Sequence, residues 1–294
     1  MRPLFLPRMP RDAAEELSLV LSSAGIQNRA VRGPGGWMLL VPPALHARAM
    51  EEIRAFDEEN PLEDEYPGRG EGQEQAPAKQ GFVSGVYAAL LLAAVYAASG
   101  PMEESRELLR ALGALSPAVK HGQVFRLVTA LTLHVDVVHL VGNMAGIALF
   151  GGAVAAVAGR GAGWLLVVAG GVGGNLATAL VHTTPHLSVG ASTSVFAAIG
   201  ILGGFRLIRP GEGGRRGARP WVILGAGLAL LGLLGSGPRS DLLAHLFGYL
   251  CGVGLGLAYA KAFDHPPGKR VQAAALGLVV LLLAGSWAWG YAAF

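Results

Sequence analysis

Long apolar runs, broken by short glycine-rich or charged stretches, fill the chain from about residue 81 to about residue 292. Most of them have about 17 to 25 residues, the length that an α-helix needs to cross a hydrocarbon core of roughly 30 Å. Because lipid offers the backbone no hydrogen-bond partner, such runs must form helices. Only 15% of the residues are charged, whereas a soluble domain carries about 25%. The sequence therefore predicts an all-α polytopic membrane protein.

Seven membrane spans are expected, and together they make residues 81–294 one transmembrane domain. The approximate spans are Gly81–Ser99, Val137–Ala158, Trp164–Val181, Ser192–Ile208, Trp221–Leu234, Leu242–Ala260 and Val271–Ala292. The fifth is short. The first is followed by a long mixed segment, Pro101–Leu133, which we expect to include an amphipathic piece at the membrane interface.

Residues 1–60 have soluble character and predict a small α+β domain of order βαββα. Its expected elements are a strand at Leu4–Leu6, a helix from Asp12, strands at Asn28–Arg32 and Trp37–Val41, and a helix at Pro43–Glu58. It holds no set of catalytic side chains, so we interpret it as a docking or regulatory domain whose ligand is unknown. Residues 61–80, rich in Glu, Gln, Gly and Pro, predict a flexible acidic linker.

Basic residues gather in three of the loops, and short cytoplasmic loops accumulate Lys and Arg. These residues are Arg160 after the second span, Arg206, Arg209, Arg215, Arg216 and Arg219 after the fourth, and Lys261, Lys269 and Arg270 after the sixth. We therefore expect all three loops and the N-terminal domain on the cytoplasmic side. The net charge of +3 is too small to indicate a nucleic-acid partner, so the bilayer is the expected surrounding.

A Gly-x-Ser turn, Gly190-Ala-Ser192, opens the fourth span. A glycine there lets the backbone bend tightly, and the mouth of a helix aims N–H groups at nearby negative charge. Ser192 is therefore a candidate nucleophile at the outer end of its helix. A serine that merely caps a helix is the alternative that this motif alone leaves open.

His245 begins the sixth span at a depth comparable to that of Ser192. A neutral imidazole is suited to take the proton of a serine hydroxyl, so His245 is the candidate base. Phe196 lies one helical turn after Ser192 and could stack under the imidazole. We expect no carboxylate partner at that depth, so the pair would be a Ser-His dyad. A histidine that only packs is the alternative.

His139 and Asn143 are one helical turn apart in the second span, so their side chains point the same way. Both can donate N–H groups, and acyl transfer needs such donors where the tetrahedral oxyanion forms. Alternatively, Asn143 could hydrogen-bond between helices. In the sixth span Ala244, Gly248, Gly252 and Gly256 form a small-residue stripe that predicts close packing against another helix.

These three stretches, Gly190-Ala-Ser192, His139-x-x-x-Asn143-Met144 and His245-x-x-Gly248-x-x-x-Gly252, resemble the signature motifs of the rhomboid intramembrane serine proteases. The resemblance spans roughly residues 81–260 and includes Gln123–His134 and Gly173-Gly174-Asn175. It implies a six-helix bundle plus a seventh helix.

The same resemblance implies roles for the residues of the site. Ser192 would be the nucleophile and His245 the general base and acid; His139, Asn143 and the Ser192 N–H would form the oxyanion hole. Gly190, Phe196, His134 and Gly248 would support them. The family acts without metal or cofactor on single-pass membrane proteins, near the outer end of their transmembrane segment. The implied location is a bacterial inner membrane, with a cytoplasmic N-terminus.

Two departures from the family pattern carry expectations of their own. Thr193 stands where most members have a glycine, and we expect its side chain to crowd bulky substrates. The alternative is that Thr193 caps the helix or hydrogen-bonds near the site. Ala155 or Ala156 replaces an acidic residue that many members have near the end of helix two, which puts the usual anchoring of the first loop in doubt.

Three other functions were weighed. A catalytically inactive rhomboid-like protein could bind and escort membrane helices, although the retained Ser192 and His245 argue against it. A metal transporter could use the histidines at 134, 139, 182, 186 and 245 as ligands, but no carboxylate lies deep in a span. A zinc protease lacks the His-Glu-x-x-His stretch that it would need.

Overall fold

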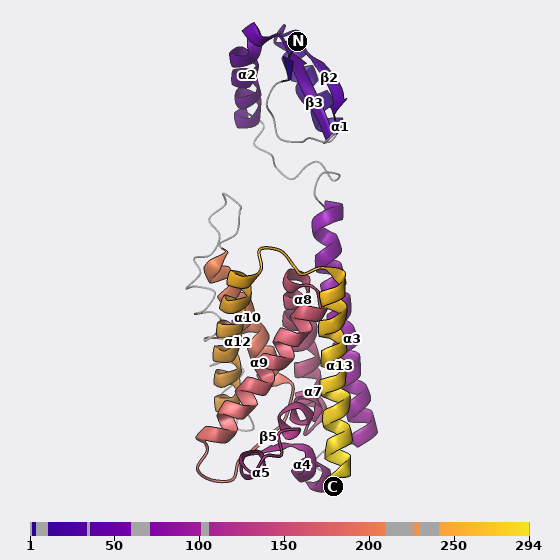
Figure 1. Ribbon diagram of the computed structural model, residues 1–294, viewed down its shortest axis with the longest axis vertical. Coiled ribbons are helices and arrows are strands. Elements are labelled where there is room, and N and C mark those ends of the chain that lie inside the picture. Colours follow the sequence, from indigo (N-terminus) through magenta and orange to yellow (C-terminus); the bar gives the residue numbers. More distant parts are fainter. Residues whose placement is uncertain are drawn as a thin grey trace. The chain divides into compact units, whose positions relative to one another are not determined.

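The computed structural model describes residues 2–3, 11–33, 36–59, 71–100, 106–209 and 241–293, together with positions 225, 227 and 229. The chain forms two compact units, Met1–Glu74 and Gln75–Phe294. Figure 1 colours the chain from indigo at the N-terminus to yellow at the C-terminus. Each unit is described by itself. The second unit contains every candidate site residue.

The N-terminal unit is a three-stranded antiparallel sheet with two helices. Its elements are β1 (Arg2–Pro3), α1 (Arg11–Ser23), β2 (Arg29–Gly33), β3 (Gly36–Val41), a 3₁₀ turn at Pro43–Leu45 and α2 (His46–Glu59). The strand order is β1-β3-β2, so β3 is the central strand. Alternate residues of β3, Leu39 and Val41, are fully buried against Leu21, Ile26 and Ile53, as the period of two along a strand requires. The expected strand at Leu4–Leu6 lies outside the described residues.

The second unit is helical, and five of its described helices are long and apolar enough to span a membrane. These segments are Ala78–Ser99 within α3 (Glu71–Ser99), Val137–Ala158, α9 (Arg160–Val181), α12 (Leu242–Ala262) and α13 (Lys269–Ala292). The shorter α10 (Ser192–Ile208) is apolar as well. The protein is therefore an integral, multi-pass membrane protein.

Two helices begin four or more residues earlier than the sequence predicted. α3 starts at Glu71 rather than Gly81, because Glu, Gln, Ala and Lys before Gly81 favour helix; the second half of the expected linker is therefore helical. α9 starts at Arg160 rather than Trp164, where Gln272 caps its first turn. The remaining linker residues 61–70 lie outside the described residues. Most of the expected fifth span, Trp221–Leu234, also lies outside them, as do Arg215, Arg216 and Arg219.

The second span is a composite helix of α7 (Val137–Gly146), a π-helical turn η3 (Ile147–Gly151) and α8 (Gly152–Ala158). α3 approaches this turn very closely. A Cβ on Gly85 would lie 2.3 Å from the Ala148 carbonyl oxygen, and one on Gly81 would lie 2.5 Å from the Gly152 oxygen. The first span thus packs on the second through glycine backbone.

Several short elements connect α3 to α7. They are α4 (Arg106–Leu112), β4 (Ala114–Leu115), α5 (Ser116–Lys120), α6 (Arg126–Thr129) and a 3₁₀ turn at Ala130–Thr132; we call this segment the first loop. β4 pairs with β5 (Leu187–Ser188), which lies between α9 and α10. The first loop therefore contacts the strand that leads to Ser192.

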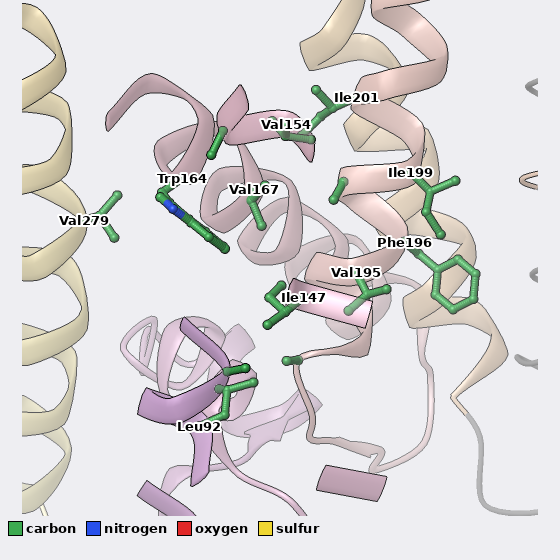
Figure 2. Packing of buried hydrophobic residues seen from close by; sticks show 14 of the residues in the cluster. Leu92, Ile147, Val154, Trp164, Val167, Val195, Phe196, Ile199, Ile201 and Val279 are labelled. Carbon is green, nitrogen blue, oxygen red and sulfur yellow. The ribbon is translucent and has the colours of Figure 1, made fainter. Parts of the chain in front are cut away.

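The core of this unit lies around α9, α10 and the second span (Figure 2). Trp164 and Val167 come from α9, Val195 and Ile199 from α10, and Ile147 from the π turn. α10 and α12 approach each other through the predicted glycine stripe. A Cβ on Gly252 would lie 2.1 Å from the Ala197 oxygen, and one on Gly256 would lie 2.2 Å from the Ile201 oxygen.

α13 packs along α9 and is fastened at both ends. Gln272 accepts hydrogen bonds from the N–H groups of Gly161 and Ala162 at 2.7 and 2.9 Å. Near the other end, Trp287 Nε1 donates to Thr132 Oγ1 at 3.1 Å. Figure 1 shows this end of α13 beside the first loop.

Candidate active site

Ser192 is the first residue of α10, where the expected turn is present. Gly190 has φ +117°, a backbone conformation that residues with a Cβ rarely adopt. Its N–H donates to the Ala130 carbonyl at 2.9 Å, which ties the turn to the first loop. The first N–H groups of a helix have no partner within the helix, so those around Ser192 are available to bind negative charge.

His245 lies in the first turn of α12 and reaches Ser192 directly. The distance from its Nε2 to Ser192 Oγ is 2.7 Å, a full hydrogen bond. The helices come this close because Gly248, one turn after His245, lies against Thr193; a Cβ there would be 2.4 Å from the Thr193 oxygen. The ring of Phe196 stacks on the His245 imidazole, with centroids 4.7 Å apart and planes 29° apart.

His139 and Asn143 lie beside the same turn. α7 begins at an N-cap, Asp136, whose carboxylate accepts the His139 N–H at 2.8 Å. A Cβ added to Gly190 would lie 2.7 Å from His139 Nε2 and 3.3 Å from Asn143 Nδ2, so glycine leaves room for both side chains. Asn143 Nδ2 is buried and has no hydrogen-bond partner among the described residues. An amide donor without a partner beside the Gly190 turn can bind an oxyanion.

His134 holds the other side of this turn. Its ring meets that of His139 edge-on, with centroids 5.2 Å apart, and its Nε2 accepts the Ala191 N–H at 3.4 Å. Burial first, and then the nearby His139, lower the pKa of His134 to about 4. The imidazole is therefore neutral at pH 7, as an acceptor nitrogen must be.

Thr193 differs from its expected role. It is only 3% exposed, and its methyl group lies between α9 and α12: a Cβ on Gly174 would be 2.5 Å from Thr193 Cγ2, and one on Gly248 would be 3.0 Å from it. The side chain therefore fills a space between helices and cannot crowd a substrate. Glycines in the facing helices make room for it.

Asp241 is a residue whose part in the site the sequence analysis missed. It is the N-cap of α12, and its carboxylate accepts from Ala244 N–H, His186 Nε2 and Ser188 Oγ. Burial would raise its pKa, but the hydrogen bonds from Ser188, His186 and Ala244 outweigh burial, and the pKa lies below its usual value. A carboxylate thus does lie near the expected dyad. Its position at a helix start was the one signal in the sequence.

The first loop is anchored by apolar packing and by Arg126, although Ala155 and Ala156 offer no carboxylate. Leu112, Phe125 and Leu133 form a buried cluster with Trp287 and Val189 packed against it. Arg126 donates to the carbonyls of Arg110 and Gly113. The C-terminal part of α13 therefore supplies the packing surface for this loop.

The five histidines that were considered as metal ligands make other contacts. His182 stacks on His186 with centroids 3.8 Å apart, while the remaining three lie around Ser192. In the part of the chain that the structure describes, no three His, Cys, Asp or Glu side chains are grouped so as to hold a metal ion.

Comparison with known proteins identifies the domain that contains the site. The family description "Rhomboid domain" matches residues 121–262. Over 135 residues the chain is 34% identical to the rhomboid protein YdcA of Bacillus subtilis (strain 168), covering 46% of this chain and 66% of YdcA. It is 32% identical over 176 residues to the rhomboid protease GluP of the same organism, covering 58% of this chain and 33% of GluP. The chain thus spans just under two thirds of the one relative and one third of the other. The residues of the candidate site therefore lie within a rhomboid domain, in a chain that is similar to two rhomboid proteins.

Proposed function

We propose that this protein is an intramembrane serine endopeptidase whose catalytic groups are Ser192 and His245. The observation that carries the proposal is the 2.7 Å contact between His245 Nε2 and Ser192 Oγ. It joins two side chains at the starts of two apolar helices, 53 positions apart in the chain. A histidine that only packed would have no reason to reach a serine beside unpartnered donors.

In the proposed reaction, His245 Nε2 accepts the Ser192 hydroxyl proton as Oγ attacks the scissile carbonyl carbon. The resulting oxyanion is stabilised by the Ser192 N–H, the Asn143 amide and a ring N–H of His139. Collapse of the intermediate breaks the C–N bond, and His245 passes the proton to the leaving amine. A water molecule, deprotonated by His245, then hydrolyses the acyl ester and restores the serine.

The proposed substrates are single-pass membrane proteins, cut near the outer end of their transmembrane segment. Ser192 and His245 each lie in the first turn of an apolar helix, which favours a cut near one membrane face. We assign no metal or cofactor to this reaction. The proposed setting is a bacterial inner membrane, with residues 1–60 as a cytoplasmic domain that binds an unidentified ligand.

A fluorophosphonate probe on the purified full-length chain tests the proposal, together with cleavage of a model single-pass protein in liposomes. We expect the probe to label Ser192 covalently, and the substrate to be cut in the presence of chelators. Binding of the substrate without labelling or cleavage would favour the escort function instead. Labelling at a serine other than Ser192 would also contradict the proposal.

Asn143→Ala is expected to lower turnover by roughly 10- to 1,000-fold, because the loss of one oxyanion donor typically costs that much. The variant should still react with fluorophosphonate, since the nucleophile and base remain. Cleavage rates of the variant and the wild type in the same liposomes provide the measurement. Wild-type turnover would leave Asn143 as a contact between helices.

The orientation can be tested with single cysteines. We expect a cysteine at Gly213, which lies outside the described residues, to be labelled from the cytoplasmic side, because five arginines surround it in the sequence. A cysteine at Thr184, which precedes Ser192, should be labelled from the outer side. Both are made in a Cys251→Ala background and treated with an impermeant maleimide, once on intact cells and once after the membrane has been opened. Labelling of both from one side would refute the proposed topology.

A further inference from the structure

We propose that Asp241 is a positioning residue that holds the Ser192 turn and the His245 helix in register; this inference rests on the proposed protease function. One carboxylate group receives donors from both sides of the site. Oδ1 accepts the Ala244 N–H of α12 at 3.1 Å. Oδ2 accepts from His186 Nε2 at 2.7 Å and from Ser188 Oγ, both on the segment that leads to α10.

The two residues that this hydrogen bond joins, Ser188 and Asp241, are each the same number of positions from a member of the candidate dyad. Ser188 precedes Ser192 by four positions, and Asp241 precedes His245 by four. The His245 N–H also donates to the Asp241 carbonyl at 3.0 Å. A shift of Asp241 relative to Ser188 would therefore change the distance between Ser192 Oγ and His245 Nε2.

The packing of α10 against α12 gives such a link a role. Gly248, Gly252 and Gly256 bring the backbones together, and a glycine surface offers few side chains that resist sliding along the helix axis; the Thr193 methyl group against Gly248 is one of them. Hydrogen bonds are directional, and those of Asp241 lie at the end of the interface nearest the site. The carboxylate thus sets the axial register that the glycine stripe leaves open.

The two donors to Asp241, Ser188 and His186, are themselves held in place. Ser188 is 4% exposed and is paired with Ala114 in the two-stranded sheet. The His186 carbonyl accepts the Ser116 N–H at 2.8 Å. Because the first loop holds both donors, Asp241 connects α12 to a well-fixed segment, the one that contains His186 and Ser188.

Asp241→Asn is the variant that tests the inference. Asparagine is an equally good N-cap, but the amide NH2 group that replaces Oδ2 cannot accept the hydrogen bonds from His186 and Ser188. We expect the rate of Ser192 labelling by fluorophosphonate, and kcat for a model substrate, to fall by about 10- to 100-fold, the effect of a misplacement of about 1 Å. KM and the melting temperature should change little. Asp241→Glu should restore part of the loss, because it keeps the charge.

Two further variants separate positioning from general stability. Asp264→Asn alters an acidic residue just beyond the opposite end of α12, paired with Arg209 at 3.0 Å, and should label at the wild-type rate. Ser188→Ala should slow labelling, and combined with Asp241→Asn it should add almost nothing, because the two act as a unit.

Two sets of results would contradict either the role of Asp241 or the proposed protease function. Wild-type labelling by Asp241→Asn, fully additive losses in the double variant, or an equal loss in Asp264→Asn would overturn the inference while the proposed function stands. A wild-type protein that neither labels nor cleaves would overturn the proposed function, and this inference with it.

Discussion

Alanine at either Ser192 or His245 is expected to lower cleavage of a model membrane substrate by about 10⁴-fold or more. Without Ser192 there is no nucleophile, and without His245 nothing accepts the proton of the hydroxyl at 2.7 Å. Because the two act as one unit, the double variant should be hardly slower than either single one. Initial rates in liposomes, at equal amounts of folded protein, give the comparison.

His265 offers a matched control for the histidine. It lies beyond the opposite end of α12 and is exposed, so His265→Ala should cleave at the wild-type rate. Substantial cleavage by Ser192→Ala would rule out the serine mechanism. A double variant far slower than both single ones would mean that Ser192 and His245 contribute separately.

Gly252→Ala is expected to destabilise the membrane unit strongly, whereas Gly254→Ala, two positions along the same helix, is not. A Cβ at Gly252 would lie 2.1 Å from the Ala197 carbonyl oxygen, and one at Gly254 meets nothing within 4 Å. Inserting a methyl group into a filled interface costs about 1 to 3 kcal/mol. At the open position alanine should stabilise the helix by about 0.4 to 1 kcal/mol.

Thermal unfolding in detergent, followed together with fluorophosphonate labelling, measures both effects. Gly252→Ala should melt at a lower temperature and label more slowly, because α10 and α12 carry the two candidate catalytic groups. Gly254→Ala should melt at the wild-type temperature or slightly above it. Equal melting temperatures for the two variants would show that the close contact of α10 and α12 is not needed for stability.

The features of the fold that the sequence predicted best are those set by local signals. The starts of α10 at Ser192 and of α12 at Leu242 coincide with the expected residues, because a glycine turn and an aspartate mark them. The spacing of His139 and Asn143 likewise follows from one helical turn. The early start of α3 at Glu71 was missed because polar helix formers before a span look like a linker.

Contacts between distant segments could not be predicted in the same way. Asp241 meets Ser188 across 53 positions, and nothing near either residue reveals the other. The position of the Thr193 side chain depends on Gly174 and Gly248, which belong to two other helices. Such pairings depend on how helices pack, and a single sequence shows hydrophobic faces but not which faces meet.

The fastening of α13 to the first loop has a consequence for biosynthesis. Trp287 and Thr132 are 155 positions apart. Because a chain is made from its N-terminus, the first loop is synthesised long before the helix that covers it. Until Trp287 and Gly290 arrive, the cluster around Phe125 lacks the α13 residues that cover it. The loop is linked to the Ser192 turn through Ala130 and Gly190. The packing around the candidate site therefore becomes complete only after residue 290 has been translated.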